Sequence, residues 1–181
     1  MHYPGTVVET VQYKAGASRQ MFDGIFATGG ITLSQVSVIT GLETYLIQNW
    51  VKRGFVEAPE KKMYSSDQLA RIIFINMLKD TLQIDKICSL IKVLQGPTAD
   101  KADDLISDSE LYHLYVDLLA TSDITKVESE YTAGRIKEIL GSFEERIPGS
   151  HKKLAKIFEI MFYAHQASVL RKNAEEAFAA L

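Results

Sequence analysis

Cysteine is almost absent from this sequence of 181 residues, because Cys88 is the single one. One thiol excludes an internal disulfide and any metal site that needs several thiolates from one chain. A reducing compartment suits such a chain best. The sequence also lacks a run of 18 apolar residues, and no basic segment followed by an apolar run stands at its amino terminus. We therefore expect neither a membrane span nor a signal peptide, and we expect a cytoplasmic protein without a membrane partner.

Motifs for catalysis and cofactor binding are lacking as well. The histidines are far apart and form no HxH or HExxH pair; they are His2, His113, His151 and His165. No Walker sequence, GxGxxG or GxSxG occurs. Cys88 lies on the apolar side of a predicted helix, which favours a buried structural thiol over a redox or metal role. We predict no catalytic residues, no metal site, no cofactor and no enzyme activity.

Net charge is also low, at -3, which argues against indiscriminate binding to polyanions. The charge is unevenly distributed, however. Residues 31–96 contain 8 Lys and Arg against 6 Asp and Glu, a net +2, whereas residues 97–181 contain 10 against 15, a net -5. The first region permits contact with nucleic acid without requiring it, and we expect the two regions to have different partners.

The stretch LSQVSVITGLETYLIQNWVKRGFV contains two helix-period segments separated by a glycine. Thr32 and Gln35, three residues apart, match a capping box and predict a helix over residues 33–40. Gly41 supplies the turn, and a second helix is predicted over residues 44–54, where a glycine ends it. Two short helices with this separation are typical of a helix-turn-helix.

The rest of the chain is predicted to be helical as well, which gives an all-α fold class. Further helices are expected over residues 18–26, 66–82, 84–96, 109–121, 126–140 and 151–180. A small hairpin or loop is expected around Pro59. The predicted division is an arm and short helix at 1–30, a helix-turn-helix domain at 31–96, an acidic linker at 97–108, and a helical dimerisation or effector region at 109–181.

The second helix of the pair has two contrasting sides. Its apolar side consists of Ile47, Trp50, Val51 and Gly54, and its polar side consists of Tyr45, Gln48, Asn49 and Lys52, with Arg53 at the edge. Gln and Asn side chains pair bidentately with adenine, while Lys and Arg reach guanine or phosphate. A solvated surface is the alternative explanation. Together with the turn glycine and the following basic loop, the pattern favours nucleic acid, and Trp50 is expected to be a core anchor.

The stretch quoted above, followed by YSSDQLARIIFINMLKDTLQIDKICSLI, resembles the MerR-type winged helix-turn-helix over about residues 33–94. The wider run from MFDGIFATGGITLSQV through IQNWVKRG to ELYHLYVDLL resembles a bacterial family defined by a domain of unknown function that carries this DNA-binding domain. The resemblance implies an amino-terminal winged helix-turn-helix, MerR-like, with a carboxy-terminal helical region.

The resemblance puts Tyr45, Leu46, Gln48 and Asn49 at DNA-contact positions, and it puts Lys61, Lys62 and Tyr64 in or next to the wing. The full set of predicted DNA-binding residues is Thr44, Tyr45, Gln48, Asn49, Lys52, Arg53, Lys61, Lys62, Tyr64 and Arg71. Gln48 and Asn49 stand where MerR-type helices usually present Arg and Tyr, and the wing is shorter. A different sequence preference and fewer wing contacts are therefore expected.

A long helix is predicted over residues 151–180 and would extend about 45 Å. In MerR-type regulators such a helix pairs antiparallel with its partner, which implies a homodimer here; docking of its apolar stripe on its own chain is the alternative. The expected function is a sequence-specific regulator of transcription, with the helix from Thr44 to Arg53 in the major groove of double-stranded DNA. A helix-turn-helix scaffold that serves as a protein-protein interaction module is the alternative. A small-molecule effector would suit a regulator, but no motif supports one.

Overall fold

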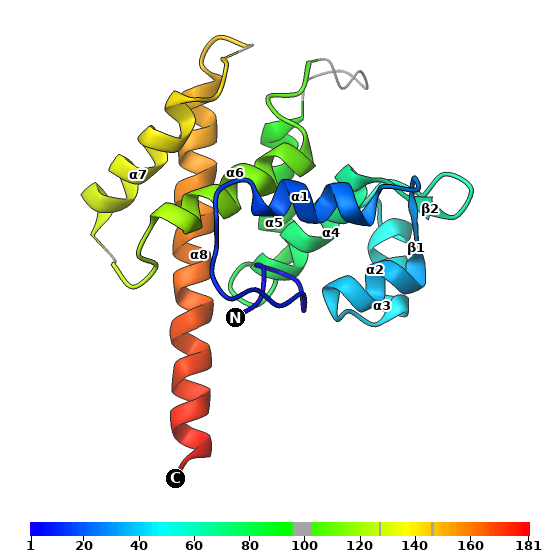
Figure 1. Cartoon of the computed structure of the whole chain (residues 1–181), viewed down its shortest axis with the longest axis horizontal. Coiled ribbons are helices and arrows are strands. Elements are labelled where there is room, and N and C mark those ends of the chain that lie inside the picture. Colours follow the sequence, from blue (N-terminus) through cyan, green and yellow to red (C-terminus); the bar gives the residue numbers. More distant parts are fainter. Residues whose placement is uncertain (96–102, 127, 146) are drawn as a thin grey trace. The chain divides into compact units, whose positions relative to one another are not determined.

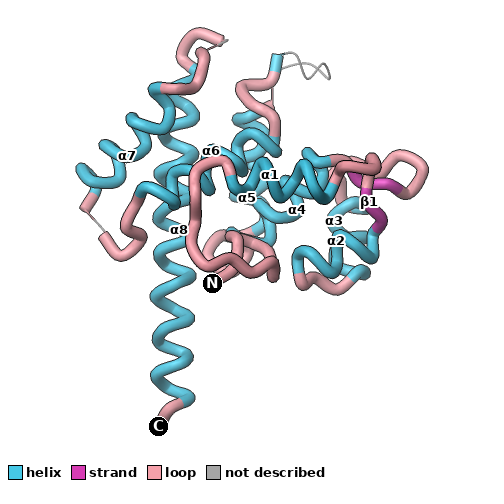
Figure 2. Tube along the Cα trace, in the orientation of Figure 1, coloured by secondary structure: helices cyan, strands magenta, loops and turns pink. Residues whose placement is uncertain are grey.

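The computed structural model describes residues 1–95, 103–126, 128–145 and 147–181. These residues are mostly helical (Figure 1), and the helices are α1 (Ala17–Ile25), α2 (Leu33–Thr40), α3 (Thr44–Lys52), α4 (Ser66–Leu78), α5 (Ile84–Leu94), α6 (Asp108–Thr121), α7 (Ser129–Gly141) and α8 (Ser150–Ala179). Two short strands, β1 (Ile31–Thr32) and β2 (Met63–Tyr64), pair antiparallel (Figure 2). The prediction of a predominantly helical chain is confirmed.

The chain divides into two compact units. Unit 1 contains Met1–Met77 and Ile106–Thr121, and unit 2 contains Leu78–Leu105 and Ser122–Leu181. The packing therefore groups α6 with the amino-terminal helices and α5 with α7 and α8. The predicted division, with boundaries at residues 96 and 109, instead places α5 with the amino-terminal helices and α6 with α7 and α8. Residues 97–102 of the predicted acidic linker lie outside the described residues. Within its remainder, Leu105 and Ile106 are buried.

Local capping fixes where the helices next to the two strands begin. Thr32 Oγ1 accepts from the Gln35 amide at 3.4 Å, and the Gln35 side chain accepts from the Thr32 amide at 2.8 Å. Ser65 and Gln68 exchange an equivalent pair of hydrogen bonds at the start of α4, at 2.9 and 3.2 Å. Both capping boxes are therefore present, and each sets a helix start immediately after a strand.

Helix α4 is the centre of unit 1. Its side chains Leu69, Ile72, Ile73 and Ile75 have no exposed surface. Its polar residues connect distant segments. The side-chain amide of Asn76 donates to the carbonyl oxygens of Gly5 at 2.9 Å and Thr40 at 3.0 Å. One side chain thus holds both the amino-terminal arm and the end of α2 against α4.

The amino-terminal arm contacts α2 closely. The Val7 amide donates to the Ile39 carbonyl at 3.0 Å. A Cβ atom at Gly41 would lie 2.7 Å from Val7 Cγ1, and one at Gly5 would lie 2.4 Å from the Ile73 carbonyl oxygen. Both glycines have a φ of 69°. The close approach therefore depends on the missing side chain and on the left-handed backbone.

In unit 2, α8 packs against α7 and α5. Its buried apolar residues are Leu154, Ile157, Phe158, Met161, Phe162 and Ala164. The Gln166 amide donates to the carbonyl oxygens of Ile124 at 2.9 Å and Lys126 at 2.6 Å. From Leu170 to the end of the chain every residue is exposed. The carboxy-terminal third of α8 therefore contributes little to the packing of this chain.

The start of α7 differs from its prediction. The helix begins at Ser129 rather than at Lys126. The Asp123 carboxylate accepts from the amide of Thr125 at 3.0 Å and from its hydroxyl at 2.7 Å. These bonds hold the segment in a turn, because a short acidic side chain competes with the helix for backbone donors.

Candidate nucleic-acid interface

A three-residue turn joins α2 to α3 and is held by hydrogen bonds to α2. The Gly41 amide donates to the Ser37 carbonyl at 2.8 Å, with Gly41 in the left-handed conformation. The Ser37 hydroxyl donates to the Leu42 carbonyl at 2.6 Å, and the Thr40 hydroxyl donates to the Val36 carbonyl at 2.7 Å. The turn therefore sets the direction in which α3 leaves α2.

Helix α3 has the two sides that its sequence predicts. Ile47 and Trp50 are buried, with 0% and 5% of their surface exposed, so Trp50 is confirmed as a core anchor. Tyr45 is 70% exposed. The other exposed residues of this segment are Thr44, Gln48, Asn49, Lys52 and Arg53. The structure thus brings the predicted residues of α3 together on one solvent-facing surface.

The carboxyl end of α3 is held by a Schellman motif. The Gly54 amide donates to the Val51 carbonyl at 3.0 Å, and the Phe55 amide donates to the Trp50 carbonyl at 2.9 Å. The Arg53 guanidinium lies over the Phe55 ring, 4.4 Å from its centroid. This stacking orients the arginine and was missed from the sequence, although an aromatic residue just after a helix-ending glycine is the signal for it.

Two lysines form the tip of the turn that precedes β2. The Met63 amide donates to the Glu60 carbonyl at 2.8 Å across this turn. Lys61 and Lys62 have φ values of 49° and 66° and are exposed. Left-handed backbone at both central positions is typical of a type I′ turn, which favours Asn and Gly. For a residue with a side chain this conformation costs about 1–2 kcal/mol, so the turn presents two ammonium groups at the expense of local stability.

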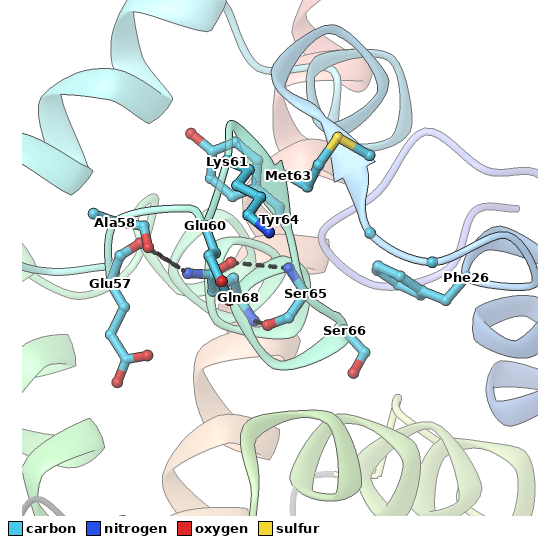
Figure 3. Close-up of a pocket in the computed structure, with 12 residues that line it drawn as sticks. Phe26, Glu57, Ala58, Glu60, Lys61, Met63, Tyr64, Ser65, Ser66 and Gln68 are labelled. Carbon is cyan, nitrogen blue, oxygen red and sulfur yellow. Dashed lines mark hydrogen bonds between the residues drawn. The ribbon is translucent and has the colours of Figure 1, made fainter.

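The lysine turn is anchored to the rest of unit 1 by the strand pair and by Gln68. β1 and β2 pair Ile31 with Tyr64 and Thr32 with Met63. Figure 3 shows Gln68 reaching from α4 toward the loop, where its amide donates to the carbonyl oxygens of Glu57 at 3.2 Å and Ala58 at 3.0 Å.

A hollow of about 710 Å³ lies beside this anchor. The residues that line it are Phe26, Gly29, Gly30, Glu57, Ala58, Glu60, Lys61, Met63, Tyr64, Ser65, Ser66 and Gln68. The lining contains two carboxylates and one ammonium group, a balance that does not favour a phosphate. We assign the hollow no ligand and regard its residues as support for the turn.

Two of the predicted contact residues lie apart from this surface. Tyr64 is 3% exposed in β2, and burial raises the pKa of its hydroxyl. The guanidinium of Arg71 pairs with the Asp108 carboxylate at 2.7 Å, and the side chains are 12% and 16% exposed. Neither side chain reaches outward as the prediction requires. The ion pair could not be predicted from the sequence because its partners are 37 residues apart.

The part of the chain that the structure describes contains no candidate metal site. Among those residues no group of three or more His, Cys, Asp or Glu side chains has the geometry to hold a metal ion. Cys88 lies partly exposed in α5. No described helix is both long and apolar enough to cross a membrane.

Comparison with known proteins places part of this region in a wider context. A family model described as a domain of unknown function, DUF1836, matches residues 30–115. The chain is 31% identical over 86 residues to a protein of Bacillus subtilis (strain 168) described as uncharacterized protein YkrK. That alignment covers 45% of this chain and 37% of the relative, so the chain matches little more than a third of the relative's length. No solved structure matches the chain.

Proposed function

We propose that unit 1 is a MerR-like winged helix-turn-helix and that it binds double-stranded DNA sequence-specifically, with α3 in the major groove. The observation that carries this proposal is the exposed polar side of α3, whose opposite side is fixed in the core by Ile47 and Trp50. An α-helix with its side chains is about 10–12 Å in diameter, and the major groove is about 12 Å wide. The helix therefore suits that groove in size.

The chemistry of the exposed side supports base reading by Gln48 and Asn49. Each amide offers a donor and an acceptor, the pair needed to contact the edge of adenine. Lys52 and Arg53 supply positive charge at the far end of the helix, and Arg53 is held by its stacking on Phe55. Phosphate contacts of this kind fix the position of a protein on DNA, while contacts to base edges carry sequence information.

Lys61 and Lys62 serve as the wing in this proposal. Their turn is short and strained, and it is tied to α4 through the loop that Gln68 holds. Two ammonium groups at a fixed tip suit the phosphates that flank the major groove. Tyr64 and Arg71 are left out of the proposed interface, because their side chains are committed to the interior of unit 1.

We further propose that two copies associate through the carboxy-terminal part of α8. Leu170 is 61% exposed and Phe178 is 77% exposed, with Ala174 between them at helical spacing. In an antiparallel pair centred on Ala174, Leu170 of each copy lies opposite Phe178 of the other. Leu170→Glu should give a monomer in light scattering and Asn173→Glu should leave the dimer intact. A monomeric wild-type chain would refute the association.

The test of DNA binding is selection of binding sites from random duplexes. DNA binding accords with the expected cytoplasmic location. The selected duplex should lose affinity by at least tenfold for a Gln48→Ala, Asn49→Ala double variant, because good base contacts contribute about 1–3 kcal/mol each. Gln20→Ala removes an exposed amide from α1 and is the matched control. Recovery of no enriched duplex, or equal affinity of the double variant, would contradict the proposal.

A protein-protein interaction module is the second candidate. The observation in its favour is the presence of exposed carboxylates next to the same surface, at Glu43, Glu57 and Glu60. These charges oppose the four basic residues of α3 and the turn, so the surface has little net positive charge. A crosslinking profile in cells with no enriched DNA, together with a stable protein partner that the Gln48 and Asn49 variants lose, would support this candidate over the first.

A further inference from the structure

Unit 2 contains a groove between α7 and α8 that the proposed DNA interface does not use. Its volume is about 670 Å³, and its lining residues are Ala133, Ile136, Lys137, Leu140, Gly141, His151, Lys152, Ala155, Lys156 and Glu159. Small-molecule sites commonly have volumes of about 300–1,000 Å³. The groove is therefore of the size that holds one small ligand.

The floor of the groove is apolar and exists because small residues line both helices. Ile136 and Leu140, one turn apart on α7, are buried beneath it. Ala133 and Ala155 leave room above them. A Cβ atom added at Gly141 would have no neighbour within 4 Å. A flexible aliphatic or flat aromatic body would find contacts here that water does not provide.

The rim of the groove is positively charged. It carries Lys137, Lys152 and Lys156 against one carboxylate, Glu159, which pairs with Lys156 at 2.8 Å. Among the described residues, no carboxylate lies within 4 Å of the ammonium groups of Lys137 and Lys152. These cations gather in the part of the sequence whose net charge is -5. The arrangement leaves two ammonium groups to face a bound anion.

The imidazole of His151 is held at one end of the groove by its contacts with the segment before α8. Its Nε2 lies 2.8 Å from the Phe143 carbonyl oxygen, and its ring lies 6.0 Å from the Phe143 ring. The His151 amide donates to the Glu145 carboxylate at 3.2 Å. These contacts hold the turn before α8, so the histidine shapes one end of the groove.

We propose that the groove between α7 and α8 binds a small amphiphilic carboxylate, whose carboxylate pairs with Lys137 and Lys152 and whose apolar body packs on Ile136 and Leu140. The charge of the rim selects against a cationic amphiphile. An interface with a second protein usually buries more than 1,000 Å² in total, and a ligand-sized groove is too small for that. This site lies within unit 2, and the inference is independent of DNA binding by unit 1.

The test uses the full chain and decanoate as the probe, with calorimetry as the readout. Decanoate should bind with saturation, while decyltrimethylammonium, which has the same tail and the opposite charge, should not. A Lys137→Gln, Lys152→Gln double variant should bind decanoate at least tenfold more weakly. Lys153→Gln is the matched control, because this neighbouring lysine is exposed and does not line the groove.

A second variant tests the floor of the groove. Ala155→Leu places a larger side chain in the groove without harming helix propensity, and it should abolish decanoate binding while the circular dichroism spectrum stays unchanged. Failure of the wild-type chain to bind decanoate would overturn the proposal. Equal binding by the double variant and Lys153→Gln, or equal binding of the cationic probe, would do so as well.

Discussion

The two units are held together by different kinds of contact. In unit 1, charged side chains bridge segments far apart in the sequence, because Arg19 reaches both Glu110 and Asp117 at 2.6 Å, and Arg71 reaches Asp108 at 2.7 Å. In unit 2, ion pairs are mostly between neighbouring side chains of one helix, such as Lys172 and Glu176. There the folded state depends mainly on apolar packing along α8.

This difference matches what each unit is proposed to do. The directional bonds of unit 1 hold α1 and α4 to α6, and reading of DNA requires such a rigid support for α3 and the lysine turn. Apolar packing is less directional and leaves hydrophobic surface open at both the groove and the end of α8. Substitutions that remove one kind of contact at a time test the comparison directly.

Removal of a large apolar side chain from unit 2 should have the largest effect. Phe158 is completely buried in α8, and Phe158→Ala should lower the free energy of unfolding by about 4 kcal/mol. Urea unfolding followed by far-ultraviolet circular dichroism measures this change. Phe178→Ala, studied at a concentration where the chain is monomeric, removes the same side chain from an exposed site and should change little. Similar losses for both variants would refute the importance of packing in α8.

Removal of the largely buried Arg71 guanidinium from unit 1 should have the next largest effect on the free energy of unfolding. Arg71→Ala deprives the Asp108 carboxylate of its ion pair in a largely buried site and should cost about 3 kcal/mol. Fluorescence of Trp50, the one tryptophan, reports on unit 1 during urea unfolding. Arg171→Ala removes the same side chain from an exposed site in unit 2 and should cost less than about 0.5 kcal/mol. Equal costs at the two positions would remove the distinction between the units.

Each unit contains a histidine whose pKa is lowered, and His165 in unit 2 should contribute most to the pH dependence of stability. Burial lowers the pKa of His165 in unit 2 to about 4. Burial also lowers the pKa of His113 in unit 1, with a further contribution from Arg19, while nearby carboxylates oppose the shift. Because the unfolded imidazole has a pKa of about 6.5, the unfolded state takes up a proton first. Stability contributed by neutral His165 is complete above that value and falls as pH decreases toward 4.

The measurement for this prediction is urea unfolding at pH 7 and pH 5. Wild-type chain should lose on the order of 2 kcal/mol between the two conditions through His165, and His165→Leu should reduce that loss. A loss of the same size in the variant would show that other groups cause the pH dependence.

The smallest expected effect lies in the turn before β2. A Lys61→Asn, Lys62→Gly double variant suits the type I′ backbone and should stabilise unit 1 by roughly 1 kcal/mol. The same change removes two positive charges from the proposed wing, so the salt slope of DNA binding should fall by about 1.8 per protomer. Gain of stability with an unchanged salt slope would exclude these lysines from the interface.

Local features of the fold could be predicted from the sequence, and long-range ones could not. The capping box of Thr32 and Gln35 and the exposed side of α3 depend on residues within one or two helical turns. The pairing of Arg71 with Asp108 and the packing of α6 in unit 1 join segments that composition and periodicity do not connect. The left-handed lysine pair carries no sequence signal, because neither position is Gly or Asn.

The contact between Val7 and Gly41 has a consequence for genetics. A Cβ atom at position 41 meets Val7 Cγ1 at 2.7 Å, so Gly41→Ala should be a loss-of-function allele even though it touches no proposed ligand. Val7→Ala removes the obstructing methyl and should act as a partial second-site suppressor, since the left-handed backbone at position 41 remains unfavourable for alanine. Recovery of Val7→Ala in a selection for suppressors would identify the amino-terminal arm as a partner of the turn that directs α3.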